Sequence, residues 1–155
     1  MIQISKPIRV GKFFKEGENL ILGTNDWSLL FYNISALIDS FKTSIKAEPV
    51  LIKDLQDHHF GSIYCLDISK DDELIATGGL DNMIKVIVNP LKMDEDTDEV
   101  LTIKFEGHKG KVWSVAFVSN LQIVSCGDKE NVIHVWDSDK AEFTHDLEGH
   151  EGGAV

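Results

Sequence analysis

Histidine and carboxylate side chains are the residues of this chain whose types and spacing could do chemistry. His58 and His59 follow Asp57, and His108 lies 49 residues after His59. Imidazoles and carboxylates act as general acids and bases and as zinc ligands. Adjacent side chains on a strand point to opposite faces, however, so the histidine pair does not form a chelate by itself. Since the chain also lacks Cys-x-x-Cys, Gly-x-Ser-x-Gly and a glycine-rich phosphate loop, we expect no catalytic residue, no cofactor and no metal, and a protein that is not an enzyme.

The same histidines mark a unit that recurs along the sequence. Its complete copy begins with Gly107-His108, reaches Trp136-Asp137 about 27 residues later, and starts again at Gly149-His150. Two degenerate copies upstream carry other residues at the marker positions: His58-His59 with Ile87-Val88, and Tyr32-Asn33. An internal period of this size predicts a repeat architecture.

Each unit contains alternating apolar runs, which predict β-strands. The expected strands lie near 62–68, 74–79 and 83–88 in the second unit and near 112–118, 121–126 and 132–136 in the third. Outer strands that precede each Gly-His are expected at 100–105 and 143–147. Two insertions lengthen the period, a helix-like segment within residues 34–49 and a connection at 89–99.

These motifs resemble those of the WD-repeat β-propeller family over about residues 8–155. The resemblance implies an all-β fold, a partial propeller of about three four-stranded blades plus the start of another. The implied organisation is one partial propeller over 1–155, with blade 1 at about 8–56, blade 2 at about 57–106, blade 3 at about 107–148 and the start of the next blade at 149–155. The sequence leaves open whether residues 1–20 complete the first blade or belong to a preceding one.

In that family a histidine, a turn carboxylate, a strand hydroxyl and a tryptophan form a hydrogen-bonded network inside a blade. The resemblance implies structural, non-catalytic networks with these members: Thr24, Asp26 and Tyr32 in the first blade; His59, Thr77 and Asp81 in the second; His108, Ser125, Glu130, Trp136 and Asp137 in the third. Ile87 replaces the second tryptophan, and Cys126 stands where the third hydroxyl is expected, with Ser125 beside it. No copy then has every member, so we expect weakened networks and a stability that depends on apolar packing.

Charge and composition limit the function classes. The net charge of −11, with scattered lysines and arginines, argues against a nucleic-acid surface. No apolar stretch reaches the roughly 18 residues of a membrane span, and the N-terminus does not resemble a signal peptide. Cys65 and Cys126 lie in separate predicted strands, which indicates a reducing, cytoplasmic compartment. The acidic run at 92–100 is expected to be a solvated loop, the alternative being a docking tail for a basic partner.

About three blades are too few for a closed ring, because propellers typically close with 4–8 blades. An open fan exposes strand edges and blade faces, which favours association. Two explanations follow: the chain is a piece of a longer protein, or it is a split propeller completed by another copy of itself or by a second chain.

Repeat propellers present rigid surfaces, so function has to be argued from a site on them. The candidate protein-binding residues are Trp27, Phe60, Lys109, Lys111 and Trp113. The alternative for Trp113 is packing on an inner strand, and for Trp27 it is packing on its own blade. The expected partners are other proteins or peptides, with no nucleic acid and no membrane insertion.

A finer resemblance concerns residues 61–86, GSIYCLDISKDDELIATGGLDNMIKV, which are similar to a blade of nemitin-type microtubule-associated WD-repeat proteins. It implies a non-catalytic scaffold of a larger eukaryotic assembly at the cytoskeleton, a microtubule or a cilium. Because microtubule walls are acidic, the net charge favours an adaptor over direct binding. The alternative function is a substrate-recognition adaptor of the ubiquitin-ligase type that binds short peptide motifs, against which the low basic content argues.

Overall fold

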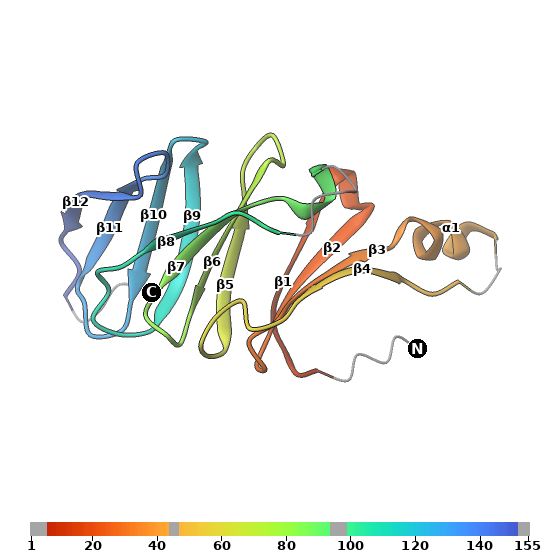
Figure 1. The fold of residues 1–155 in the computed structure, drawn as a ribbon, viewed down its shortest axis with the longest axis horizontal. Coiled ribbons are helices and arrows are strands. Elements are labelled where there is room, and N and C mark those ends of the chain that lie inside the picture. Colours follow the sequence, from red (N-terminus) through yellow and green to blue (C-terminus); the bar gives the residue numbers. More distant parts are fainter. Residues whose placement is uncertain (1–5, 44–46, 94–98, 152–155) are drawn as a thin grey trace.

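The computed structural model describes residues 6–43, 47–93 and 99–151. Within these ranges the chain forms three four-stranded antiparallel sheets, called blades 1 to 3 below, which stand side by side as a fan (Figure 1). Blade 1 contains β1 (Ile8–Phe14), β2 (Asn19–Thr24), β3 (Leu29–Asn33) and β4 (Val50–Leu55). Blade 2 contains β5 (Ile63–Ile68), β6 (Leu74–Gly79), β7 (Ile84–Val88) and β8 (Thr102–Phe105). Blade 3 contains β9 (Val112–Ser119), β10 (Gln122–Gly127), β11 (Val132–Asp137) and β12 (Glu142–Glu148).

Strands pair in sequence order within every blade, so each strand lies beside its neighbour in the chain. The strands expected in the second and third units are confirmed, with ends that differ by at most two residues. The open question about the N-terminal segment is resolved as well, because Gly11 of β1 pairs with Leu22 of β2. Residues 8–14 therefore complete blade 1.

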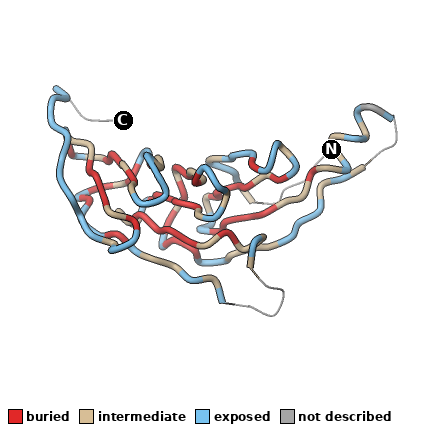
Figure 2. Tube along the Cα trace, turned by 90° about the horizontal axis from the view of Figure 1, so that it is seen from above, coloured by how far each residue is buried: buried red, intermediate tan, exposed pale blue. Residues whose placement is uncertain are grey.

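The apolar core lies between the blades. One cluster joins blades 1 and 2 around Phe31 and Ile63, and another joins blades 2 and 3 around Val112 and Trp136. Each buried side chain of this size contributes about 1.5–3 kcal/mol relative to an exposed one. The inner strands β1, β5 and β9 contact one another across the blades, whereas β12, at one end of the fan, is exposed along its whole length (Figure 2). The all-β partial propeller expected from the sequence is thus confirmed.

The insertion after β3 contains α1 (Ser35–Thr43). Its start is capped by Asn33, whose Oδ1 accepts hydrogen bonds from the backbone N–H (3.1 Å) and the hydroxyl (2.5 Å) of Ser35. Two 3-10 turns, η1 (Lys15–Gly17) and η2 (Pro90–Lys92), follow β1 and β7. Most of the acidic run at 92–100 lies outside the described residues. Among the described helices, none combines the length and apolar character needed to cross a membrane.

Candidate functional site

Blade 3 contains a complete chain of hydrogen bonds. The Trp136 indole N–H donates to Ser125 Oγ at 2.8 Å, Ser125 Oγ lies 2.7 Å from His108 Nε2, and His108 Nδ1 lies 2.5 Å from Glu130 Oε2. Since an ionised carboxylate only accepts, His108 carries its proton on Nδ1 and takes the Ser125 proton at Nε2. The expectation that no copy has every member is therefore wrong, because the hydroxyl comes from Ser125 and not from the position of Cys126.

The buried position of its members gives this hydrogen-bond network of blade 3 a structural role. Burial lowers the pKa of His108, so the imidazole is neutral near pH 7, although Glu130 opposes the shift. For Glu130 burial acts against ionisation, yet hydrogen bonds from His108 and from the Lys109 backbone N–H lower its pKa. A buried polar chain in which every member is paired specifies one packing of its blade.

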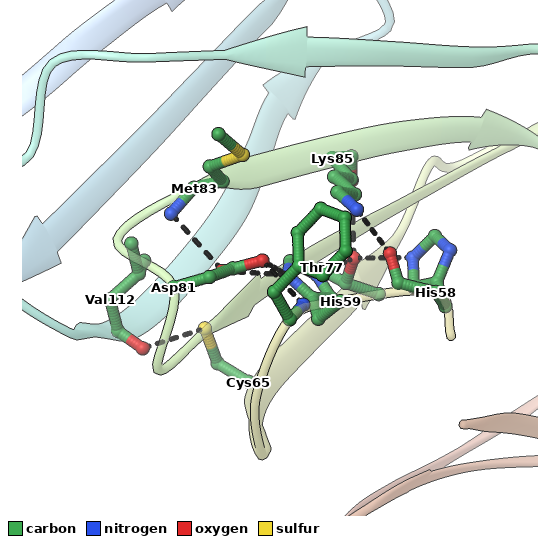
Figure 3. Close-up of polar contacts among 9 residues, drawn as sticks. His58, His59, Cys65, Thr77, Asp81, Met83, Lys85 and Val112 are labelled. Carbon is green, nitrogen blue, oxygen red and sulfur yellow. Dashed lines mark hydrogen bonds and ion pairs between the residues drawn. The ribbon is translucent and has the colours of Figure 1, made fainter. Parts of the chain in front are cut away.

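Blade 2 contains a similar hydrogen-bond network in which a different residue takes the place of the tryptophan donor (Figure 3). His59 Nδ1 lies 2.9 Å from Asp81 Oδ1, and His59 Nε2 lies 2.8 Å from Thr77 Oγ1. Thr77 Oγ1 also lies 2.9 Å from His58 Nε2. Since Thr77 gives its proton to His59, His58 must be the donor in the second contact. His58 thus supplies the N–H that Trp136 supplies in blade 3, which compensates for Ile87.

The sequence argument that His58 and His59 point to opposite faces is wrong. The pair precedes β5 and follows Asp57, whose φ of 52° places it in the left-handed region. In this turn both rings reach the Thr77 hydroxyl, with their centroids 5.0 Å apart. Burial lowers the pKa of His58 to about 3, and it also lowers the pKa of His59.

Blade 1 has no comparable chain among its described residues. Thr24 Oγ1 contacts Asp26 and the Ser28 carbonyl, contacts that close the turn between β2 and β3. In blade 1 the strand position that corresponds to Thr77 is held by Leu22, which pairs with Leu30 as Thr77 pairs with Lys85. An apolar residue therefore replaces the hydroxyl of the network. Tyr32, paired with Leu20, stands at the position of Trp136.

Asp137 lies outside the blade 3 chain. Its Oδ1 accepts the backbone N–H groups of Asp139 and Lys140, each at 3.0 Å, in the turn after β11. The bond from the Lys140 backbone is the main cause that lowers the pKa of Asp137. The acidic half of the Trp-Asp marker therefore shapes a turn.

A row of aromatic and cationic side chains crosses the three inner strands; Arg9 and Trp113 are exposed, and Tyr64 and Lys111 are partly buried. The Tyr64 and Trp113 rings lie 4.7 Å apart between centroids, Arg9 lies 5.6 Å from the Tyr64 centroid, and Lys111 Nζ lies 5.2 Å from the Trp113 centroid. The row repeats from blade to blade. Arg9, Tyr64 and Trp113 each follow the first residue of an inner strand, and that first residue pairs with the last residue of the next strand in all three blades. We call these four residues the inner row.

Two members of the inner row, Lys111 and Trp113, were candidates from the sequence, and Trp113 is 37% exposed. Arg9 and Tyr64 were missed. The signal that could have found Tyr64 is its position, because it follows the buried Ile63 that opens β5 as Trp113 follows the buried Val112 that opens β9. Arg9 could not be aligned because the first copy lacks a recognisable start.

The other candidates do not join the inner row through any contact in the described structure. Trp27 occupies a turn tip with a φ of 74°, and its carbonyl accepts the His59 backbone N–H at 3.3 Å. Phe60 is 70% exposed, with Lys85 Nζ 5.4 Å from its ring centroid. The exposed Lys109 donates its backbone N–H to Glu130 Oε1 at 3.1 Å.

A groove of about 950 Å³ lies between the outer strands of blades 1 and 2, and Leu55, His58 and Leu101 contribute to its lining. Its charged lining residues are Lys53, Asp54, Asp57, Lys85, Glu99 and Lys104. Because these charges balance, the groove favours neither an anionic nor a cationic ligand.

Comparisons with known proteins agree with this architecture. The WD40 family, described as "WD domain, G-beta repeat", matches residues 49–87 and 99–137. Cell division control protein 4 of Saccharomyces cerevisiae is 29% identical over 96 residues, which are 62% of this chain and 11% of that protein. Protein HIR1 of Kluyveromyces lactis is 27% identical over 92 residues, which are 53% of this chain and 11% of that protein. The chain thus spans only a small part of these relatives.

Solved structures show the same fold. The structure of U3-55K superposes with a TM-score of 0.69 at 18% identity and covers 97% of this chain and 42% of that one. The crystal structure of RRP9 WD40 repeats gives a TM-score of 0.69 at 17% identity and covers 97% and 41%. This chain therefore corresponds to less than half of either structure.

Proposed function

Because this chain belongs to the WD40-repeat family, whose domains bind other proteins, we propose that it is a non-catalytic interaction module of a larger assembly. The observation that carries the proposal is the inner row, Arg9, Tyr64, Trp113 and Lys111. Aromatic and arginine side chains are enriched among the residues that dominate binding energy at protein interfaces. The buried networks of blades 2 and 3 fix the strands that present this row.

The chemistry of the inner row favours a partner segment that combines a carboxylate with an apolar side chain. Arg9 and Lys111 supply cations at its ends, and the Tyr64 and Trp113 rings supply apolar area between them. Arg9 donates its Nε–H to Asn25 Oδ1 at 2.6 Å, which orients the guanidinium. A net charge of −11 repels an acidic partner at long range. Salt screens that repulsion beyond about 8–10 Å, so recognition depends on the local cations.

Two settings are compatible with such a module. The first is a scaffold of a cytoskeletal or ciliary assembly in the cytoplasm, which rests only on the resemblance of residues 61–86 to microtubule-associated WD-repeat proteins. The second is a substrate-recognition adaptor of the ubiquitin-ligase type, which the cations of the inner row favour because they suit an acidic peptide motif. A third arrangement is completion of the ring by another copy or a second chain.

The experiment is affinity purification with the full chain, followed by affinity measurements on the recovered partner. Trp113→Ala is expected to weaken binding by at least tenfold, because exposed aromatic anchors contribute about 2 kcal/mol or more. Phe41→Ala, which alters a residue that is 82% exposed on α1, is the matched control and should bind normally. Equal binding by wild type and Trp113→Ala would exclude the inner row. Recovery of ubiquitin-ligase subunits instead of cytoskeletal proteins would select the second setting.

A further inference from the structure

Three potential metal ligands meet in blade 3. His108 precedes β9, Glu130 lies in the turn between β10 and β11, and His134 lies on β11. All three are buried, and one ligand atom from each lies within 4.8 Å of the others. Sequence reasoning compared His108 only with the remote pair in blade 2 and overlooked His134. The signal was available, because His134 follows the turn carboxylate Glu130 by four residues.

Each of the three side chains is also held from outside the cluster. His134 Nδ1 contacts the Asp146 carboxylate, and His108 Nε2 lies 2.7 Å from Ser125 Oγ. Glu130 Oε1 accepts the Lys109 backbone N–H at 3.1 Å. Metal-binding histidines almost always engage a carboxylate, carbonyl or water through the second ring nitrogen, which fixes the ring orientation. The cluster already has such outer partners.

One nitrogen of the cluster has no hydrogen bond in the described structure. His134 Nε2 is enclosed, and it lies 3.2 Å from Glu130 Oε1 without the geometry of a hydrogen bond. The residue as a whole is 9% exposed. Asp146 occupies the Nδ1 side of the ring, so Nε2 is the nitrogen that faces the cluster. We propose that His108 Nδ1, Glu130 and His134 Nε2 form a binding site for a zinc-class divalent cation.

The donor set fits this cation. Two imidazoles and one carboxylate are established zinc ligands, with zinc–ligand distances of about 2.0–2.2 Å. A tetrahedral site with such distances separates its ligand atoms by about 3.4 Å. His134 Nε2 and Glu130 Oε1 are already 3.2 Å apart, whereas His108 Nδ1 and Glu130 Oε2, at 2.5 Å, have to move apart to admit the ion. His134 already presents Nε2 to the cluster and Nδ1 to Asp146. His108 must move its proton from Nδ1 to Nε2, where Ser125 Oγ can accept it, and no net proton is released.

Blade 2 provides an internal comparison. It has the same histidine, carboxylate and hydroxyl in His59, Asp81 and Thr77. The position of His134, opposite the network hydroxyl, is occupied there by Lys85. An ammonium group at that position repels a metal cation and offers no lone pair. The site is therefore specific to blade 3.

The test is titration of the full chain, freed of metal by a chelator, with Co²⁺ as a visible probe and with Zn²⁺ by calorimetry. We expect one ion per chain and tetrahedral cobalt absorption. His134→Gln should weaken binding at least 100-fold, while the exposed His145→Gln on the neighbouring strand should bind normally. Asp146→Asn removes only the outer partner, so an intermediate loss of about 10–100-fold is expected.

Circular dichroism and the unfolding midpoint of each metal-free variant show whether it is folded. His134→Gln leaves the hydrogen bonds from Trp136 to Glu130 in place, so it should fold. Two results would overturn the site: no binding at micromolar Co²⁺ or Zn²⁺, or binding that His134→Gln does not change.

Discussion

Replacing Thr77 by valine isolates the contribution of the shared hydroxyl in blade 2. Thr77 is completely buried, and its Oγ1 is the common partner of His58 Nε2 at 2.9 Å and His59 Nε2 at 2.8 Å. Valine has nearly the same shape and suits a strand equally well. The substitution therefore removes the hydroxyl and leaves two buried ring nitrogens without a partner.

The expected loss of unfolding free energy follows from these two nitrogens. A buried polar group that loses its partner costs about 1–3 kcal/mol, so the two together cost about 2–6 kcal/mol. The added methyl group offsets about 0.8 kcal/mol of this cost. The net loss for Thr77→Val should then be about 1–5 kcal/mol, a large part of the 5–15 kcal/mol typical of a domain.

Urea unfolding measures this loss as a lower midpoint at an unchanged slope. Thr144→Val, at an exposed position on β12, is the control and should change the free energy by less than about 0.5 kcal/mol. In a His58→Phe background, Thr77→Val should cost about 1 kcal/mol less, because only one nitrogen is then stranded. A loss of unfolding free energy equal to that of Thr144→Val, or the same loss in both backgrounds, would show that His58 and His59 do not share the Thr77 hydroxyl as a hydrogen-bond partner.

Three further changes test other parts of the fold. Burial lowers the pKa of His58 to about 3 from an unfolded value near 6.5, so the unfolded chain takes up a proton on His58 at a higher pH than the folded chain does. The stability that the neutral His58 contributes is present above pH 6.5. It is lost by about 1.4 kcal/mol per pH unit as the pH falls towards 3. Gly78→Ala would place a Cβ 2.7 Å from the Cys65 sulfur, and urea unfolding should show a loss of about 1–3 kcal/mol. Trp136→Phe removes the donor to Ser125 and part of a buried ring, and should cost about 2 kcal/mol or more in the same assay.

Each of these changes has a comparison variant. His58→Gln should reduce the dependence of stability on pH between 6.5 and 4, and a curve identical to that of wild type would contradict the assignment to His58. At Gly11→Ala the only contact of the new Cβ below 3.4 Å is the flexible end of the Leu22 side chain, at 2.8 Å, so this change should cost less than Gly78→Ala. Trp113→Phe at the half-exposed inner row should cost less than Trp136→Phe, and an equal loss would argue against the blade 3 network.

The repeat period, the strands and most members of the networks could be predicted from the sequence. Apolar alternation reports the burial of one strand face, and turn acids report local backbone geometry, so both signals survive without knowledge of the neighbouring blade. The hydroxyl of blade 3 was misplaced for a local reason. Counting four residues back from the acid, as in Thr77 and Asp81, leads to Cys126, but this turn is one residue longer and the hydroxyl is Ser125.

By itself the sequence determined which segments of the second and third units form strands, because these follow from local periodicity, whereas the start of the first unit came from the pairing of β1 with β2. Only the tertiary structure decided that His58 replaces a tryptophan as donor, since this depends on the left-handed backbone at Asp57. It also decided that Arg9, Tyr64 and Trp113 form one surface, because they come from three blades whose relative placement is set by the packing between sheets. Contacts between residues far apart in the chain leave no periodic trace, so a single sequence does not contain them.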